Sequence, residues 1–205
     1  MFSFIFILQE GLYERPDNVD LANVNLNYQM KMALDKIAFL PFAYVMDKWR
    51  WEIFGDPSLE KFINQKWWDL RIKYQGISPP VERTEDDFDP GAKYHIPANV
   101  EYVRYFVSHV LQFTFYDQMC KSVGNFTEDN LYTCDFNENV EAGKALKKML
   151  SYGSSKSWPA ILKEFTGQED MSLKSLKKYF NPLTKFLDDY IKREKIVPGW
   201  KRKFK

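Results

Sequence analysis

The sequence has few of the residues that most often bind metals or carry redox chemistry. Only two histidines, His95 and His109, and two cysteines, Cys120 and Cys134, occur among 205 residues. The chain also lacks a His-Glu-x-x-His pair, the helical motif that holds zinc beside a general base in many peptidases. We therefore expect no zinc ion to bind this chain alone.

The chain is also nearly neutral, and it has no long apolar run. The 29 basic and 28 acidic residues leave a net charge of +1, so no general attraction to nucleic acid or an acidic membrane follows. No segment reaches the roughly 18 apolar residues needed for a membrane span. The apolar start, residues 1–8, lacks a basic region and a cleavage site, so it is a poor signal peptide. The basic tail, residues 201–205, is interpreted as a solvated terminus.

Aromatic residues, in contrast, are abundant. They make up 17% of the chain, and hydrophobic residues make up 45%. This composition excludes a disordered chain. It also suggests more aromatic surface than one small helical layer buries, which is consistent with a partner surface.

Apolar residues at helical spacing predict a mostly α fold with little strand. Between residues 23 and 54 we expect two helical segments joined by a kink at Pro41. Asp56 followed by Pro57 is a typical helix start, and this helix should end at Gly76. Residues 77–90 form a proline-containing acidic stretch that predicts an irregular solvated loop.

The second half of the sequence continues the helical pattern after one short extended segment. Residues 93–96 should be extended because Pro97 disfavours helix before it, and Asn99 should cap a long helix that ends at Cys120. Further helices are expected over 138–150, 158–165, 173–180 and, after Pro182, 183–196.

Lysine, histidine and tyrosine side chains gather around residues 93–105. Lys93 and His95 would point the same way on an extended segment, and Tyr102 and Tyr105 lie one helical turn apart. Such donors could hold an anionic ligand that carries a carbonyl group. The ordinary alternative is a solvated lysine, core-edge tyrosines and a satisfied histidine. Trp67 and Arg71 likewise fit either a cation packed on an aromatic ring or an anion site.

The two cysteines lie 14 positions apart and flank Asn125-Phe-Thr127, an N-glycosylation acceptor sequence. A small extracellular disulfide loop would have this pattern. Two buried free thiols and a chance sequon are the alternative. A disulfide and a glycan at Asn125 would both indicate secretion.

Several long strings of this sequence closely resemble the angiotensin-converting enzyme family. They are residues 31–42 (KMALDKIAFLPF), 47–51 (DKWRW), 67–76 (WWDLRIKYQG), 91–95 (GAKYH) and 102–113, which begins YVRYF. The resemblance covers residues 22–200 and implies the C-terminal third of a large helical ellipsoid with a central channel. Residues 1–21 match poorly.

The resemblance also implies roles for individual residues. Lys93 and Tyr102 would bind the C-terminal carboxylate of a peptide substrate, His95 a backbone carbonyl, and Tyr105 the oxyanion of the transition state. Phe39 and His109 would line the pocket for the last side chain, although the family commonly carries phenylalanine at the position of His109. Trp67 and Arg71 would belong to one chloride site and Arg104 to another.

These expectations give a leading hypothesis and one alternative. The chain would be the substrate-binding portion of a secreted zinc peptidyl-dipeptidase, truncated before the zinc motif and inactive without the missing N-terminal part. The alternative is a non-catalytic peptide-binding or scaffold module, which a signal peptide joined directly to this sequence would favour.

Overall fold

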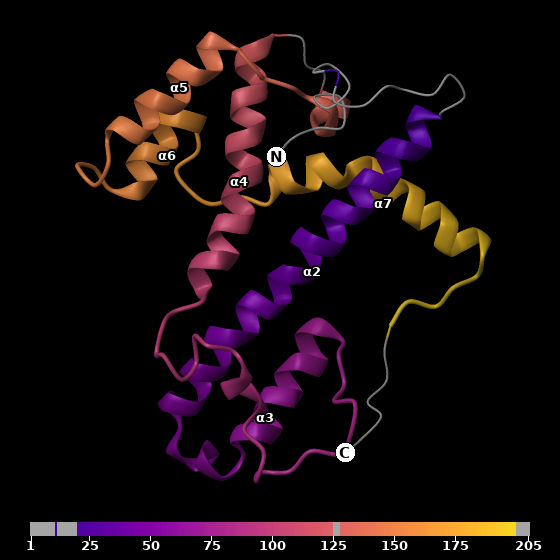
Figure 1. Ribbon diagram of the computed structural model, residues 1–205, viewed down its shortest axis with the longest axis vertical. Helices are drawn as coiled ribbons and strands as arrows, with labels where there is room; N and C mark the ends of the chain where they lie inside the picture. Colours follow the sequence, from indigo (N-terminus) through magenta and orange to yellow (C-terminus); the bar gives the residue numbers. More distant parts are fainter. Residues whose placement is uncertain (1–10, 12–19, 125–127, 200–205) are drawn as a thin grey trace. The chain divides into compact units, whose positions relative to one another are not determined.

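The computed structural model describes residues 11, 20–124 and 128–199, and these contain six α-helices and no β-strand (Figure 1). The mostly α prediction is thereby confirmed. The described residues fall into two compact units. One is drawn from the ranges 1–32 and 109–190, the other from 33–108 and 191–205. The helices α2 (Leu21–Gly55) and α4 (Val103–Val123) contribute residues to both units.

Pro41 lies inside α2, which is one helix on both sides of the proline, whereas two helical segments joined by a kink were predicted. A proline removes one helical hydrogen bond and crowds the preceding turn, but the helix continues when its flanking turns are held. The residues after Pro41 are held by burial. Ala43, Val45, Met46, Trp49 and Ile53 enter the core of the second unit, together with Trp67, Leu70 and Tyr102.

The segment after α2 begins and ends as the sequence predicted, but it is divided into three parts. Asp56 accepts a hydrogen bond from the Ser58 amide at 3.0 Å and starts a 3-10 turn, Pro57–Lys61. The helix α3 (Ile63–Leu70) follows and passes into a π-helical turn, Arg71–Gln75. Gly76 ends the turn in the left-handed region, at φ 70°.

The acidic loop before residue 90 is irregular, as predicted, and two of its carboxylates fix α3. Glu85 accepts hydrogen bonds from the amides of Asn64 and Gln65, at 2.9 and 2.8 Å, so it caps the N-terminus of that helix. Asp89 accepts from the Trp68 indole at 2.8 Å and from the Arg83 guanidinium. Arg83 is the main cause that lowers the pKa of Asp89 to about 2.

Residues 94–99 form turns and only Lys93 has an extended backbone, so the predicted extended segment 93–96 is wrong. The amides of Ile96, Ala98 and Val100 donate to the carbonyls of Lys93, Tyr94 and His95 at 2.9–3.0 Å. Asn99 has a positive φ of 51° and lies before the start of α4. It therefore does not take the predicted position of an N-cap.

The first unit contains the helical hairpin of α5 (Val140–Ser151) and α6 (Trp158–Thr166), which lie side by side (Figure 1). Asn139 caps α5 by accepting from the Ala142 amide at 2.8 Å. Gly167 ends α6 at φ 76°, as the sequence predicted. A disulfide joins Cys120 in α4 to Cys134, as predicted, with 6.0 Å between the Cα atoms.

The last helix, α7 (Lys174–Arg193), also continues through a proline, although a break at Pro182 was predicted. The buried side chain of Gln29 explains the continuity. Its Nε2 donates to the Tyr179 carbonyl at 2.7 Å, and its Oε1 accepts from the Leu183 amide at 3.0 Å. Tyr179 and Leu183 are the i and i+4 partners of one helical bond. The Gln29 amide thus bridges the turn that the proline disturbs.

Candidate functional site

The predicted donors Lys93, His95, Tyr102 and Tyr105 all belong to the second unit and lie together. His95 Nε2 is 3.1 Å from the Tyr105 hydroxyl, a hydrogen bond whose direction depends on the imidazole tautomer. The His95 ring is 4.8 Å from the Tyr102 ring, and Lys93 Nζ is 5.4 Å from that same ring. Lys93 and His95 therefore converge on Tyr102, even though the backbone between them forms a turn rather than a strand.

The two tyrosines differ in their exposure to solvent. Tyr102 is 3% exposed and packs against Phe39 and Phe42, with ring centroids 5.9 and 5.6 Å away. Tyr105 is 36% exposed and its ring is 4.7 Å from that of Tyr102. The buried ring thus supports the cluster, whereas the Tyr105 side chain is partly exposed.

A buried ion pair in α2 holds this cluster in place. The Arg50 guanidinium pairs with Asp47 and donates to the carbonyls of His95 and Val100, at 3.2 and 2.5 Å. The other Asp47 oxygen accepts from the amides of Tyr102 and Val103, at 2.7 and 2.6 Å, and so caps α4. Asp47 and Arg50 thereby join the 93–100 turn to the helix start that carries both tyrosines.

Sequence reasoning did not assign a role to this ion pair. Asp47 and Arg50 appeared only within a string that resembles a family. The spacing could have predicted this pair, because Asp47 and Arg50 are three positions apart among apolar residues that are buried. Charged side chains are rarely buried unless they are paired.

His95 carries a second informative atom. Its Nδ1 is buried and has no hydrogen-bond partner among the described residues. Buried polar atoms in folded proteins are nearly always paired, so an orphaned atom requires an explanation. At His95 it is consistent with a ring whose partner is a bound molecule or water.

A pocket of about 530 Å³ lies beside these donors. Arg71 packs against Phe42, Trp67 and Trp68, with its guanidinium 5.3–5.6 Å from the three ring centroids. Burial lowers the pKa of Arg71, and the charge of Asp89 partly offsets this effect. These residues line the pocket together with Lys93, Arg83, Pro80, Val81 and Ala92.

The pocket residues fit a small anion. Arg71 Nε is buried without a hydrogen-bond partner among the described residues, and three aromatic rings surround the guanidinium. A desolvated cation with an unused donor is the chemistry that a chloride ion requires. Trp67 and Arg71, which were predicted for one chloride site, are in contact. Arg83 and Lys93 also line this pocket, and the sequence did not predict them as part of that site.

Arg104 and His109 are placed differently from the other predicted residues. Arg104 is exposed, forms an ion pair with Glu101, and does not line the Arg71 pocket. His109 lies farther along α4, within the first unit, where its carbonyl accepts from the Gln112 side chain at 3.1 Å. The predicted glycosylation residue, Asn125, lies outside the described residues.

The described residues contain no group of three or more histidine, cysteine or carboxylate side chains that could hold a metal ion. Zinc therefore does not fit the residues at hand. In the same described part of the chain, no helix is long and apolar enough to cross a membrane.

Taken together, the described residues form a mostly α fold with an aromatic pocket lined by cations and, beside it, a cluster of histidine and tyrosine side chains. Residues 6–200 match the family model described as angiotensin-converting enzyme. An angiotensin-converting enzyme from Mesocricetus auratus is 48% identical over 176 residues, which are 86% of this chain and 13% of that protein. The chain belongs to the angiotensin-converting enzyme family.

Two further relatives show the same relationship. The angiotensin-converting enzyme of Theromyzon tessulatum is 45% identical over 90% of this chain and 29% of its own length. The angiotensin-converting enzyme-like protein Ace3 of Mus musculus is 42% identical over 95% of this chain and 26% of its own. The chain thus spans less than a third of each of these relatives.

Proposed function

We propose that this chain forms the substrate-binding portion of a peptidyl-dipeptidase, which removes dipeptides from the C-termini of peptides. The observation that carries the proposal is the cluster in which Lys93, His95 and Tyr105 surround the buried Tyr102 ring. A cation, an imidazole and a phenol in one place match a carboxylate, a carbonyl and an oxyanion. Family membership supports the same reaction class.

Each donor takes one part of the peptide. Lys93 binds the C-terminal carboxylate with Tyr102, and His95 donates to a backbone carbonyl. The Tyr105 hydroxyl donates to the oxyanion that forms as the peptide bond is attacked, and Phe39 contacts the last side chain. Trp67 and Arg71 hold a chloride ion, whose negative charge offsets the buried guanidinium, and Arg104 serves a second chloride site.

The 205 residues do not supply the metal chemistry of the reaction. The zinc ion that activates water in this class of enzyme would be held by a part of the domain outside this sequence. Alone, the chain binds peptides without hydrolysing them. The disulfide between Cys120 and Cys134 supports secretion, because such bonds persist in oxidising compartments. A glycan at Asn125 would accompany secretion.

Peptide binding by the chain itself tests this proposal. Titration calorimetry with a tripeptide should show binding that is lost when the peptide C-terminus is amidated, because the amide removes the charge that Lys93 recognises. Lys93→Ala should weaken binding about tenfold, the loss expected for one charged hydrogen bond.

Lys73 provides a matched control for Lys93. It also packs its ammonium on a tyrosine, 5.2 Å from the Tyr74 ring, but it does not line the pocket. Lys73→Ala should leave peptide affinity unchanged. Equal binding of the free and amidated peptides, or equal losses in the two lysine variants, would contradict the proposed site.

A chimera tests the catalytic roles. Fusion to the N-terminal portion of a close relative, zinc motif included, should give chloride-stimulated release of C-terminal dipeptides. Tyr105→Phe should chiefly lower kcat, by about 10²–10³-fold for the loss of an oxyanion donor. Lys93→Ala should chiefly raise KM. A folded, zinc-loaded chimera that tolerates both changes would favour the alternative of a non-catalytic peptide-binding module.

A further inference from the structure

The first unit contains a second pocket, of about 340 Å³, that the proposed peptide site does not use. Seven residues line it and all are charged or carry amides: Asp117, Lys121, Gln168, Lys174, Lys177, Lys178 and Asn181. No aromatic or aliphatic side chain is among them. Such a lining favours a small, strongly hydrated and charged ligand over an apolar one.

Charge within this pocket is strongly unbalanced. Four lysines face one carboxylate, although the whole chain has a net charge of only +1. A concave surface lined by one sign of charge concentrates the opposite charge from solution. The pocket therefore favours anions, whereas the rest of the chain shows no such preference.

The single carboxylate is already occupied by donors from the protein. Asp117 is 6% exposed and accepts from Ser175 Oγ at 2.8 Å and from Lys178 Nζ at 3.2 Å. Lys121 Nζ lies 3.7 Å from the same carboxylate. Lys174 and Lys177 form no ion pair with any described residue.

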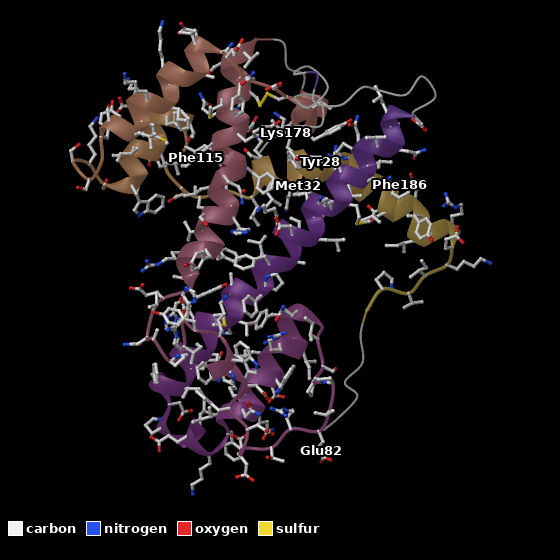
Figure 2. The ribbon with its side chains drawn as sticks, in the orientation of Figure 1. Tyr28, Met32, Glu82, Phe115, Lys178 and Phe186 are labelled. Carbon is white, nitrogen blue, oxygen red and sulfur yellow. A yellow bond between two sulfur atoms is a disulfide. The ribbon has the colours of Figure 1, made fainter. Side chains whose placement is uncertain are left out.

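The geometry of α7 explains why the charges converge. Residues 174, 177, 178 and 181 fall at helical spacings of three and four, so they lie on one face, and all four line the pocket. Lys178, labelled in Figure 2, belongs to this face, and Asp117 and Lys121 come from α4. Like charges at such spacings repel one another. A bound anion would remove that repulsion.

We propose that this pocket binds a multivalent oxyanion, namely a phosphate or sulfate group. Lys174 and Lys177 supply the charges that no carboxylate neutralises, and Gln168 and Asn181 can donate through their amides. The group is held either as a free ion or as part of a sulfated glycan. This inference concerns the first unit and does not rest on the proposed peptidase function.

Titration of the chain with inorganic phosphate and with sulfate tests the proposal. Sodium chloride is adjusted to hold the ionic strength constant, so that nonspecific screening does not change. Saturable binding should perturb the backbone amide signals of Gln168 and Lys177 in NMR spectra. Lys177→Ala should weaken the binding about tenfold, as expected for one charged hydrogen bond.

Two further variants make the test specific. Asp117→Asn keeps an acceptor for Ser175 but removes the competing negative charge, so it should tighten phosphate binding. Lys185→Ala changes another exposed lysine of the same helix that does not line the pocket, and it should have no effect. Binding that is absent at constant ionic strength, unchanged in Asp117→Asn, or equally reduced by Lys185→Ala would overturn the proposal.

A sulfated hexasaccharide distinguishes the two sources of the anion. If it binds much more tightly than inorganic sulfate, and Lys177→Ala removes that advantage, the pocket recognises a group on a glycan. If its affinity does not exceed that of inorganic sulfate, the pocket holds a free ion.

Discussion

At the scale of single residues, the structure contrasts two ion pairs that have the same sequence spacing. Asp47 with Arg50 and Glu101 with Arg104 each join an acid to the arginine three positions later. The first pair is buried and makes further contacts with four backbone groups, whereas the second is exposed. Burial therefore decides which pair organises the protein.

Arg50→Met should greatly reduce the stability of the chain. It leaves the Asp47 carboxylate buried without its partner, which costs about 3–5 kcal/mol in comparable cases. Arg104→Met removes the exposed pair and should change the free energy of unfolding little. Urea unfolding at pH 7 measures both values. Similar losses in the two variants would show that the Asp47–Arg50 pair has no special structural role.

Asp89 gives the folded chain a dependence on acid pH. Its folded pKa, about 2, lies below the ordinary value of 3.8, so its contribution is present above pH 3.8 and is lost as the pH falls through 2. Asp89→Asn should therefore cost about 2 kcal/mol at pH 7 and roughly half as much at pH 3. Asp188→Asn, an exposed change in α7, is the control. A pH-independent cost would contradict this origin.

At the scale of elements, α2 and α7 each contain a proline in the helix interior, and neither helix is broken by it. In α7 the reason is visible, since Gln29 from α2 supplies both a donor and an acceptor to the disturbed turn. Gln29 is fully buried, so this exchange takes place away from water. One side chain thus supplies hydrogen bonds to a turn in which Pro182 has no N–H to donate.

A double-mutant cycle tests this bridge. Gln29→Leu should cost about 1–3 kcal/mol for each polar group that it leaves unpaired, the Tyr179 carbonyl and the Leu183 amide. Pro182→Ala should reduce that cost, because without the proline ring the turn can tighten and the Leu183 amide can donate to the Tyr179 carbonyl. The free energies of unfolding of the two single variants and the double variant give the coupling. Additive effects would show that the bridge is unrelated to Pro182.

The sequence correctly predicted those element boundaries that depend on residues close to them in the chain. Asp56 with Pro57, Gly76 and Gly167 mark their boundaries through caps and left-handed backbone, and each lies where the sequence placed it. The errors occur where distant residues decide. Gln29 is separated by 150 positions from its partner Tyr179, and Asp47 by 55 from the helix start that it caps. Periodicity cannot reveal such contacts.

In the candidate site, too, the features set by nearby residues were predicted and those set by distant residues were not. The residue types and their spacing identified Lys93, His95, Tyr102 and Tyr105 as one group, and the structure brings them together. The backbone that presents them was predicted as a strand and is a turn. The supporting pair Asp47–Arg50 was missed, because its function depends on contacts across the core.

At the scale of the whole molecule, the chain spans 13–29% of the three relatives described above. In the proposed function, its donors act with residues from outside this sequence. The family relationship and the described residues lead to different expectations about zinc binding. The family implies a zinc enzyme, whereas the described residues contain no cluster that could hold the metal.

The purified chain should therefore bind no stoichiometric zinc. Its two histidines are 14 positions apart and lie on different elements, so they do not form a usual zinc triad. Metal analysis after dialysis against zinc should find much less than one ion per chain, and the zinc-loaded chimera serves as positive control. One tightly held zinc per chain would refute this prediction.

The Arg50 contacts with the 93–100 turn have an evolutionary consequence. Arg50 binds the turn through the carbonyls of His95 and Val100, and every residue type offers the same carbonyl. The path of the turn is therefore largely independent of the side chains that it displays. Mutations at exposed positions such as Tyr94 can change the side chains that the turn presents to a ligand, while the hydrogen bonds from Arg50 to the backbone remain. Ligand preference can thus diverge among relatives without a new fold.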